Sequence, residues 1–441
     1  MSEIRFECLR KRREAVLKSL DGREALIAAG LPSSRNFQAN CYPFRASSHF
    51  LHLAGAALPG GFLHFKSNRV TLYVPRQPEG DVLWHGQQPG PPDLADSLGV
   101  EVRYTDELNI SKAAMALPTM NEATNQQMSG YLERVIQVGH ISKADYDLAM
   151  ALVLNRLQHD EWAQSELRVA AQITADAHEL ARRELRPGAT CRHVSAVMRS
   201  HFESRSMAYA YQPIITPRGE VLHEHKLDTR MESGDLVLLD VGGEMPSGYA
   251  ADVTRTWPVN QRMSKTQRMI YQIVERAHKV AVDAVAPGVE YAEIHALAAR
   301  ELVVGLVDVG ILLGDPESLF AQNMHTAFFP HGVGHLLGLD VHDMEDLGDL
   351  AGYAPGRARR QAFGWSFLRL DRQLKEGMVV TIEPGFYMIA ELLTRFRAHP
   401  RHRQCIDWEV LAQFSDVRGI RLEDDVLVTS AGRDILSRPT A

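Results

Sequence analysis

Residues 234–243, GDLVLLDVGG, and residues 377–385, GMVVTIEPG, follow the same pattern. In each stretch a glycine precedes a continuous apolar run, which is typical of a strand buried on both faces. An acid stands six residues after that glycine, Asp240 in the first stretch and Glu383 in the second. A carboxylate at the end of a buried strand is unfavourable unless it is paired or binds a metal. The two stretches therefore predict two related strands that each bring a carboxylate to a functional site.

The helices that precede these strands repeat as well. Apolar residues near the period of about 3.6 predict a helix in each copy, and a Pro-Gly pair ends it. Residues of the first copy recur one hundred positions later: Arg168, Gln172, Ile173, Ala177, His178, Pro187 and Gly188 match Arg268, Gln272, Ile273, Ala277, His278, Pro287 and Gly288. The period is too long for a solenoid, so the repeat favours a pseudo-twofold domain with one cleft between its halves.

Length and composition bound the domain organisation. A chain of 441 residues exceeds one compact core, so we expect an N-terminal α/β domain over residues 1–158 and a catalytic domain over residues 159–441. Short apolar runs between turn signals predict strands in the first domain: EALIAAG, HFLHLAG, GFLHF, VTLYVP, DVLWHG and VEVRY. The net charge of −7 argues against nucleic acid or an anionic membrane as a partner.

The N-terminus and the cysteines favour a cytoplasmic location. The first 20 residues carry charges throughout and lack the apolar core of a secretory signal. No run approaches ~18 apolar residues, so we expect no membrane span. The four cysteines form no CxxC pair, which argues against a disulfide framework or a zinc-thiolate site.

Metal-binding side chains stand in distinctive contexts over the C-terminal two thirds of the chain. They are Asp240 in LLDVGG, Asp252 in AADVTRTW, His335 in HGVGHLLGLDVHD, Glu383 in TIEPGFY and Glu423 in GIRLEDD. Carboxylates can bridge two hard or borderline cations, and one imidazole adds a nitrogen ligand without making the site soft. Two cations about 3.5–4 Å apart can hold and activate a water, so the set predicts a metallohydrolase.

Turn residues around two of the motifs indicate how the side chains are presented. Those between Asp240 and Asp252 predict a hairpin that carries Asp252 on its second strand. Three glycines in HGVGHLLG predict a tight loop rather than a helix, because glycine lets the backbone approach a metal or substrate closely. That loop makes His331, His335 and His342 candidates for the site.

The stretch GIRLEDDVLV, residues 419–428, alternates in the way expected of a strand. Glu423 lies inside it, and Arg421 stands two residues earlier on the same face. An arginine beside a ligand carboxylate can hold its orientation. Asp424 falls on the opposite face, where we expect a solvated acid.

The motifs LLDVGG, AADVTRTWPV, PHGVGHLLGLDVHD, TIEPGFY and GIRLEDDVLVT closely resemble those of the pita-bread metallopeptidases. Within that group they are most similar to prolidase and aminopeptidase P, which cleave Xaa-Pro bonds. The resemblance covers residues 160–430 strongly and continues more weakly into FRASSHFLHLAGA, TLYVPR and VLWHG. It implies an α+β pita-bread catalytic domain with an internal duplication, preceded by a smaller α/β domain.

The resemblance also implies a role for each matching residue. Asp240 would bind one cation alone, Asp252 and Glu423 would bridge both, and His335 and Glu383 would complete the other. Glu383 would also shuttle a water proton. Further matches would line the substrate site: His223, His331, His342 and Arg421. Among them, His342 would lie beside the developing oxyanion. Two divalent cations are implied, manganese first, with cobalt or zinc as alternatives.

Several features resemble prolidase more than aminopeptidase P. The segments from His342 to Glu383 and from Glu383 to Glu423 are both long. Arg369 falls where prolidases place the arginine that binds the free carboxylate of a dipeptide. These features favour an enzyme that cleaves Xaa-Pro dipeptides, and the resemblance implies a homodimer. Aminopeptidase P, acting on longer peptides, is the alternative, and a metal-free binding module is the third reading.

Departures from the family pattern concern the substrate pocket. TPRGE replaces a glycine-rich turn, LHEH replaces LHY around His223, and the hairpin between Asp240 and Asp252 is one residue longer than usual. We expect these differences to change the shape of the pocket more than the metal site.

Overall fold

The computed structural model describes residues 3–438, and they form two compact units. The first unit runs to Trp162 and also includes Met344–Ala351, whereas the second comprises Ala163–Asp343 and the chain from Gly352 onward. The joint predicted around residue 158 lies close to the boundary at Trp162. No sequence pattern indicates that residues 344–351, which we call the excursion, belong to the first unit. Among the described helices, none combines the length and the apolar character that a membrane crossing requires.

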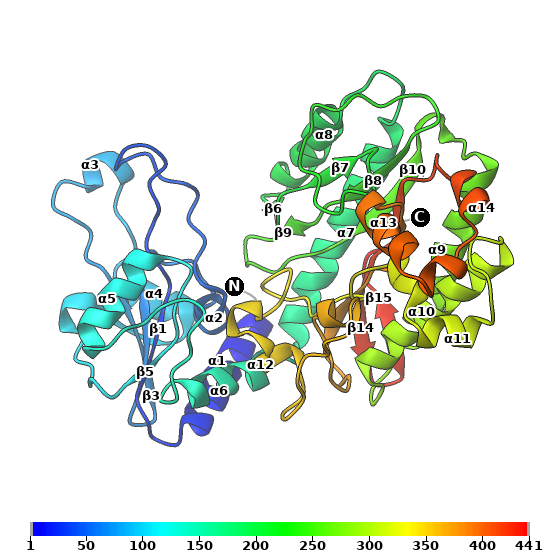
Figure 1. Cartoon of the computed structure of the whole chain (residues 1–441). Helices are drawn as coiled ribbons and strands as arrows, with labels where there is room; N and C mark the ends of the chain where they lie inside the picture. The colour runs from blue at the N-terminus through cyan, green and yellow to red at the C-terminus, as the bar shows by residue number, and fades with distance from the viewer. Residues whose placement is uncertain (1–2, 439–441) are drawn as a thin grey trace. The chain divides into compact units, whose positions relative to one another are not determined.

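The first unit contains a mixed sheet (Figure 1). Its strand order is β4-β3-β2-β1-β5, antiparallel in the centre and parallel at both edges. The strands are β1 (Ala25–Ala28), β2 (Phe62–Lys66), β3 (Arg69–Val74), β4 (Glu101–Tyr104) and β5 (Met115–Ala116). The helices are α1 (Glu3–Leu20), α2 (Ser48–Ala54), α3 (Val82–His85), α4 (Pro91–Leu98), α5 (Glu122–Leu132) and α6 (Tyr146–Arg156).

Two of the runs predicted to be strands are helical. HFLHLAG forms most of α2, which is buried along its whole length and ends at Gly55 in the left-handed region. VLWH forms α3, which has no buried residue and therefore cannot be an inner strand of the sheet. Both predictions were wrong because a short apolar run fits a helix as well as a strand.

Hydrogen bonds through His49 tie residues 344–351 to the rest of the first unit. The carboxylate of Asp346 lies 3.1 Å from Nε2 of His49, and Arg156 donates to Nδ1 of His49 at 2.9 Å. Both His49 and Arg156 are buried. Burial alone would raise the pKa of Asp346, but His49 and Arg156 lower it to about 2. The charged form of Asp346 is therefore stabilised in the folded protein.

The second unit places short strands between the helix pair α7 (Glu161–Arg183) and α8 (Cys191–Glu203) and the pair α9 (Lys265–Asp283) and α10 (Tyr291–Asp308) (Figure 1). The shorter helices of this unit are α11 (Pro316–Ala321), α13 (Ala390–Ala398) and α14 (Trp408–Ala412), whereas most of α12 (Asp349–Gly352) belongs to the first unit. The strands are β6 (Ala208–Tyr209), β7 (Ile214–Thr216), β8 (Leu236–Asp240), β9 (Gly243–Glu244), β10 (Thr254–Pro258), β11 (Val379–Ile382), β12 (Gly385–Tyr387), β13 (Gly419–Arg421), β14 (Asp424–Thr429) and β15 (Gly432–Ile435). They form the sheets β10-β8-β7, β11-β14-β15, β12-β13 and β6-β9.

The backbone of the second unit repeats itself as the sequence predicted. Gly188 follows α7 with a φ of 83°, and Gly288 follows α9 with a φ of 87°. Gly188 donates its N–H to the carbonyl of Met231, and Gly288 donates to that of Leu374, both at 2.9 Å. The glycines before the two acid-bearing strands match as well: Gly234 has a φ of 95° and Gly377 a φ of 85°. An L side chain rarely adopts this conformation, which explains why both copies keep glycine.

The strands deliver their acids with small differences from the prediction. Asp240 ends β8 and Glu383 follows β11, as expected. Asp252, however, lies two residues before β10 rather than within it. Glu423 lies between β13 and β14, because β13 pairs with β12 whereas β14 pairs with β11. The chain therefore changes sheet at Glu423, which forms an isolated bridge with Thr254.

Candidate metal centre

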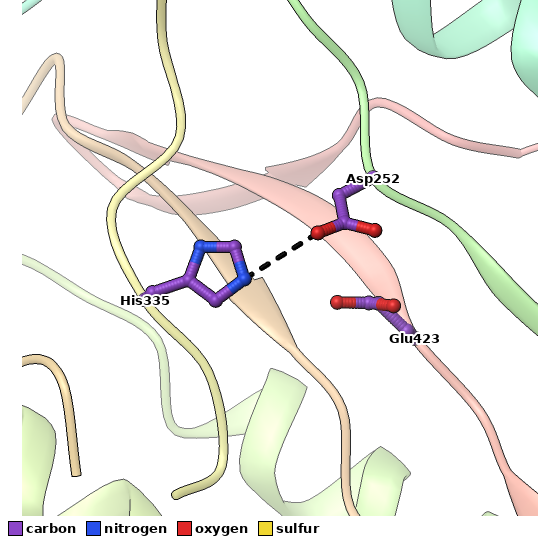
Figure 2. A group of neighbouring side chains, drawn as sticks. All are labelled: Asp252, His335 and Glu423. Atoms are coloured by element: carbon purple, nitrogen blue, oxygen red, sulfur yellow. Dashed lines mark ion pairs between the residues drawn. The ribbon is translucent and has the colours of Figure 1, made fainter. Parts of the chain in front are cut away.

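Three buried side chains meet in the second unit in an arrangement that could hold a cation. Asp252, His335 and Glu423 each offer a ligand atom, and these atoms lie within 4.8 Å of one another (Figure 2). Nε2 of His335 lies 3.4 Å from Oδ2 of Asp252. The three residues are distant in sequence, so the cluster depends on the tertiary fold.

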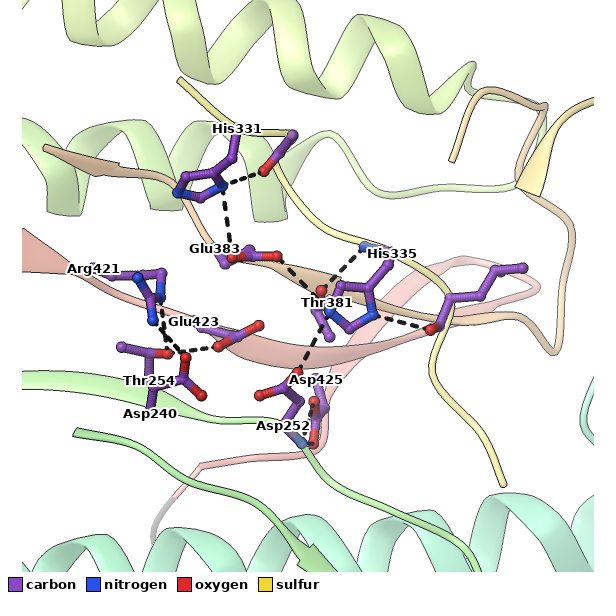
Figure 3. A network of polar contacts seen from close by, with 12 residues as sticks. Asp240, Asp252, Thr254, His331, His335, Thr381, Glu383, Arg421, Glu423 and Asp425 are labelled. Atoms are coloured by element: carbon purple, nitrogen blue, oxygen red, sulfur yellow. Dashed lines mark hydrogen bonds and ion pairs between the residues drawn. The ribbon is translucent and has the colours of Figure 1, made fainter. Parts of the chain in front are cut away.

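Asp240 and Glu383 extend this cluster (Figure 3). Oε1 of Glu383 lies 3.8 Å from Nε2 of His335. The hydroxyl of Tyr211 lies 2.7 Å from Oδ1 of Asp240 and 2.6 Å from Oδ1 of Asp252, so it links the two aspartates. The five predicted ligands therefore occupy one buried region, and Tyr211 is a contact that no sequence motif indicated.

Arg421 organises the side of the cluster around Asp240. It forms an ion pair with Asp240, and its Nε donates to Oγ1 of Thr254 at 3.2 Å. Thr254 in turn donates to Oε2 of Glu423 at 2.6 Å. Burial would lower the pKa of the Arg421 guanidinium, but Tyr387 and the surrounding carboxylates keep it well above its ordinary value. Arg421 therefore stays charged and orients Asp240 directly and Glu423 through Thr254.

The glycine-rich stretch is a loop, as predicted, and its glycines are required by close packing. A Cβ on Gly334 would lie 2.2 Å from the carbonyl oxygen of Thr381 and 2.4 Å from the hydroxyl of Tyr291. Thr381 also makes two hydrogen bonds with His335. Its Oγ1 accepts from the backbone N–H of His335 at 3.2 Å, and its own N–H donates to the carbonyl of His335 at 3.0 Å. Gly334 thus lets the loop lie against β11, where His335 meets the acids.

Hydrogen bonds fix how the two loop histidines present their nitrogens. His335 donates from Nδ1 to the carbonyl of Leu336 at 3.0 Å, which leaves Nε2 facing the acids. Burial would lower the pKa of His335, but its bond with Asp252 raises it. His331 donates from Nδ1 to the carbonyl of Gly332 at 2.7 Å, and its Nε2 lies 2.8 Å from the Tyr387 hydroxyl. Burial, with the charge of Arg421, lowers the pKa of His331 to about 3, so this ring is neutral.

The cluster carries more buried negative charge than its cationic neighbours balance. Burial raises the pKa of Asp240, raises that of Glu383 to about 7, and raises that of Glu423 well above its ordinary value. Asp252 is different: burial would raise its pKa, but bonds with His335 and Tyr211 lower it. Divalent cations would neutralise this charge and replace the proton on Nε2 of His335. The oxygen-rich set with one imidazole therefore fits divalent cations.

The remaining predicted site residues lie around this cluster. The ring of His342 is 4.3 Å from that of His335, centroid to centroid. Partial burial and the charge of Arg421 lower the pKa of His223, and the charge of Arg369 contributes. The same guanidinium contributes to the lowered pKa of His331. Arg369 is thus close enough to act on both histidines.

The loop with the unusual TPRGE sequence is tied to the strand that carries Arg421. A Cβ on Gly219 would lie 2.7 Å from the carbonyl oxygen of Gly419, so the two backbones are in direct contact. Glu220 in this loop forms an ion pair with Arg418. The replacement of a glycine-rich turn therefore leaves the segment before His223 firmly attached.

Two acids after Glu423 are buried, so the expectation of a solvated Asp424 was wrong. Arg255 and Ser437 each donate to Asp424 Oδ1 at 2.6 Å. Both carboxylate oxygens of Asp425 lie 3.2 Å from the backbone N–H of Asp252. Alternation cannot reveal this burial, because the partners of both acids come from distant segments.

Comparisons with known proteins identify the family of this chain. A model of metallopeptidase family M24 matches residues 165–430, and a model of the aminopeptidase P N-terminal domain matches residues 9–120. The chain is 31% identical to human Xaa-Pro dipeptidase over 412 residues, which covers 89% of this chain and 82% of that protein. It is 30% identical to a probable Xaa-Pro aminopeptidase of Podospora anserina over 400 residues, covering 89% of this chain and 85% of the relative.

Solved structures resemble the whole chain. Aminopeptidase PepP of Pseudomonas aeruginosa has a TM-score of 0.80 at 25% identity, covering 99% of this chain and 96% of that one. Aminopeptidase P of E. coli with the inhibitor Pro-Leu has a TM-score of 0.78 at 28% identity, covering 99% and 95%. The pita-bread catalytic domain and the smaller N-terminal domain expected from the sequence are confirmed, and the chain belongs to metallopeptidase family M24.

Proposed function

We propose that this protein is a dinuclear metallopeptidase that hydrolyses Xaa-Pro bonds and prefers dipeptides. The observation that carries the proposal is the buried meeting of Asp252, His335 and Glu423 in a chain of family M24. Relatives named Xaa-Pro dipeptidase and Xaa-Pro aminopeptidase support the substrate class.

The chain's own residues would hold two divalent cations. The ligands would be Asp240, Asp252, His335, Glu383 and Glu423. Manganese suits four carboxylates with one imidazole, and cobalt or zinc are the alternatives. When bound, such cations supply Lewis acidity that makes a water nucleophilic near neutral pH and polarises the scissile carbonyl.

Nearby side chains would handle the proton and the developing charge. Glu383 would accept the proton of the attacking water and pass it to the proline nitrogen, which carries no proton in a tertiary amide. His342, beside His335, would donate to the developing oxyanion. His331 would stay neutral, because its burial and the charge of Arg421 lower its pKa to about 3. Arg421 would keep Asp240 in place.

Arg369 would bind the free carboxylate of a dipeptide. A guanidinium matches a carboxylate with two parallel hydrogen bonds, so an anchor at this point fixes the substrate length at two residues. The charge of Arg369 contributes to the lowered pKa of His223 and of His331, two of the proposed substrate-site residues, which supports this role.

Substrate length and one substitution test this proposal. In the manganese-loaded protein, we expect Arg369→Ala to lower kcat/KM for Ala-Pro by about 10- to 100-fold, the value of a charge-assisted hydrogen bond. Cleavage of the longer peptide Ala-Pro-Leu should not change. Arg276→Ala is the control, because this arginine of the same unit pairs with Glu301 on the neighbouring helix instead. Equal losses on both substrates, or none, would contradict the carboxylate anchor.

Aminopeptidase P activity is the second candidate, and the likeness to solved aminopeptidase P structures favours it. It predicts that the wild-type protein cleaves Ala-Pro-Leu faster than Ala-Pro. We also propose a homodimer, which light scattering on the purified protein would test.

A further inference from the structure

The segment that carries Arg369 is held at one backbone atom, the carbonyl oxygen of Leu368. The hydroxyl of Tyr353 donates to it at 2.6 Å, and Nη1 of Arg359 donates to it at 3.1 Å. Arg359 also donates to the carbonyl of Ser366 at 3.0 Å, and its guanidinium lies 5.1 Å from the centre of the Tyr353 ring. We call Tyr353 and Arg359 the Leu368 clamp.

Tyr353 fixes the chain on both sides of Arg369. Its hydroxyl reaches the residue before Arg369, whereas its backbone forms a parallel bridge with Asp371, two residues after Arg369. The neighbouring Gly352 touches Arg369 itself, because a Cβ on Gly352 would lie 2.2 Å from the carbonyl oxygen of Arg369. Tyr353 therefore holds the main chain at two points, one on each side of Arg369.

The same backbone packs against the histidine loop of the site. A Cβ on Gly332 would lie 2.9 Å from Cα of Leu368 and 3.1 Å from the carbonyl oxygen of Phe367. Gly332 directly follows His331 in the loop that leads to His335. Leu368 and Leu370 are fully buried on either side of Arg369, whose own side chain is exposed. Packing thus fixes the main chain that carries the Arg369 side chain.

We propose that Tyr353 and Arg359 are positioning residues that set the preference for a free C-terminal carboxylate, by holding Arg369 through the carbonyl of Leu368. They would not touch the substrate. This inference rests on the proposed function, since it assigns Arg369 to the carboxylate of a dipeptide. An anchor loses affinity when its support moves, because a guanidinium binds a carboxylate strongly only in a defined geometry.

A pair of substrates separates this role from general stability. Ala-Pro has the free carboxylate, and Ala-Pro-amide differs only in lacking that charge. We expect Tyr353→Phe and Arg359→Met each to raise KM for Ala-Pro about fivefold, the value of one hydrogen bond, with little change in kcat. Hydrolysis of the amide should stay at the wild-type rate.

The matched control is Tyr209→Phe. Its hydroxyl donates to the carbonyl of Ser195, also at 2.6 Å, so it removes the same kind of bond elsewhere in this unit. It should lower Tm without changing the ratio of the two substrates. If the clamp variants lower Tm alone, or change both substrates equally, the inference is wrong and the proposed function stands. If the wild-type protein does not distinguish Ala-Pro from its amide, the dipeptide proposal fails, and the inference fails with it.

Discussion

Replacing Gly334 by alanine, which adds one methyl group, would test whether the glycine-rich loop holds His335 in position at the metal centre. Its Cβ would lie 2.2 Å from the carbonyl oxygen of Thr381, whereas real Cβ contacts stay above 3.0 Å. The loop and β11 must therefore separate by at least 0.8 Å, the difference between these two distances. His335 and Thr381 are bonded to each other, so the displacement reaches the imidazole. A misplacement of about 1 Å can lower a rate by about 100-fold, and we expect a loss of that size for Gly334→Ala.

The assay is kcat/KM for an Xaa-Pro dipeptide at saturating manganese, with the metal content measured on the same preparation. Gly432→Ala is the control: Gly432 has a φ of 143°, close to the 154° of Gly334, but nothing lies within 4 Å of its Cβ. The control should lose some thermal stability and keep its rate. Wild-type activity and metal content in Gly334→Ala would refute the steric reasoning.

Three further predictions concern charge. Asp252→Asn should lose activity and most of the bound manganese by elemental analysis, and a variant that keeps both would contradict the ligand assignment. Removing divalent cations with a chelator should lower Tm, and adding manganese should restore it, because the buried acids repel one another without a counter-charge. The pKa of Asp346 is lowered from 3.8 to about 2, so the interactions of its carboxylate with His49 and Arg156 stabilise the fold fully above pH 3.8 and are lost as the pH falls through about 2. Asp346→Asn should therefore lower the free energy of opening of residues 344–351 by about 2 kcal/mol at neutral pH, measured by hydrogen exchange. A gap from the wild type that does not shrink as the pH falls from 4 to 2 would argue against this source of stability.

The sequence predicted best those features in which a local residue pattern directly determines the local backbone structure. Asp240 and Glu383 end continuous apolar runs, and such runs mark buried strands. Gly188 and Gly288 adopt the same left-handed conformation, so their repetition reports a repeated backbone. These signals predicted the duplication and the acid-bearing strands without any knowledge of tertiary contacts.

Contacts between distant segments could not be predicted in this way. Tyr211 links Asp240 to Asp252, but an isolated tyrosine carries no mark of its partners. Asp424 looked solvated because its partner Arg255 comes from another strand. The strand assignment of HFLHLAG failed for a related reason: its burial is compatible with either secondary structure.

The excursion at Met344–Ala351 affects how the chain can be made and divided. The first unit is not complete until the ribosome has synthesised residue 351, well beyond the sequence of its sheet. A break after Trp162 would separate Asp346 from His49 and from the charge of Arg156, both of which stabilise its carboxylate. The two units therefore cannot be exchanged or expressed as simple consecutive fragments without also moving the segment that begins just after His342.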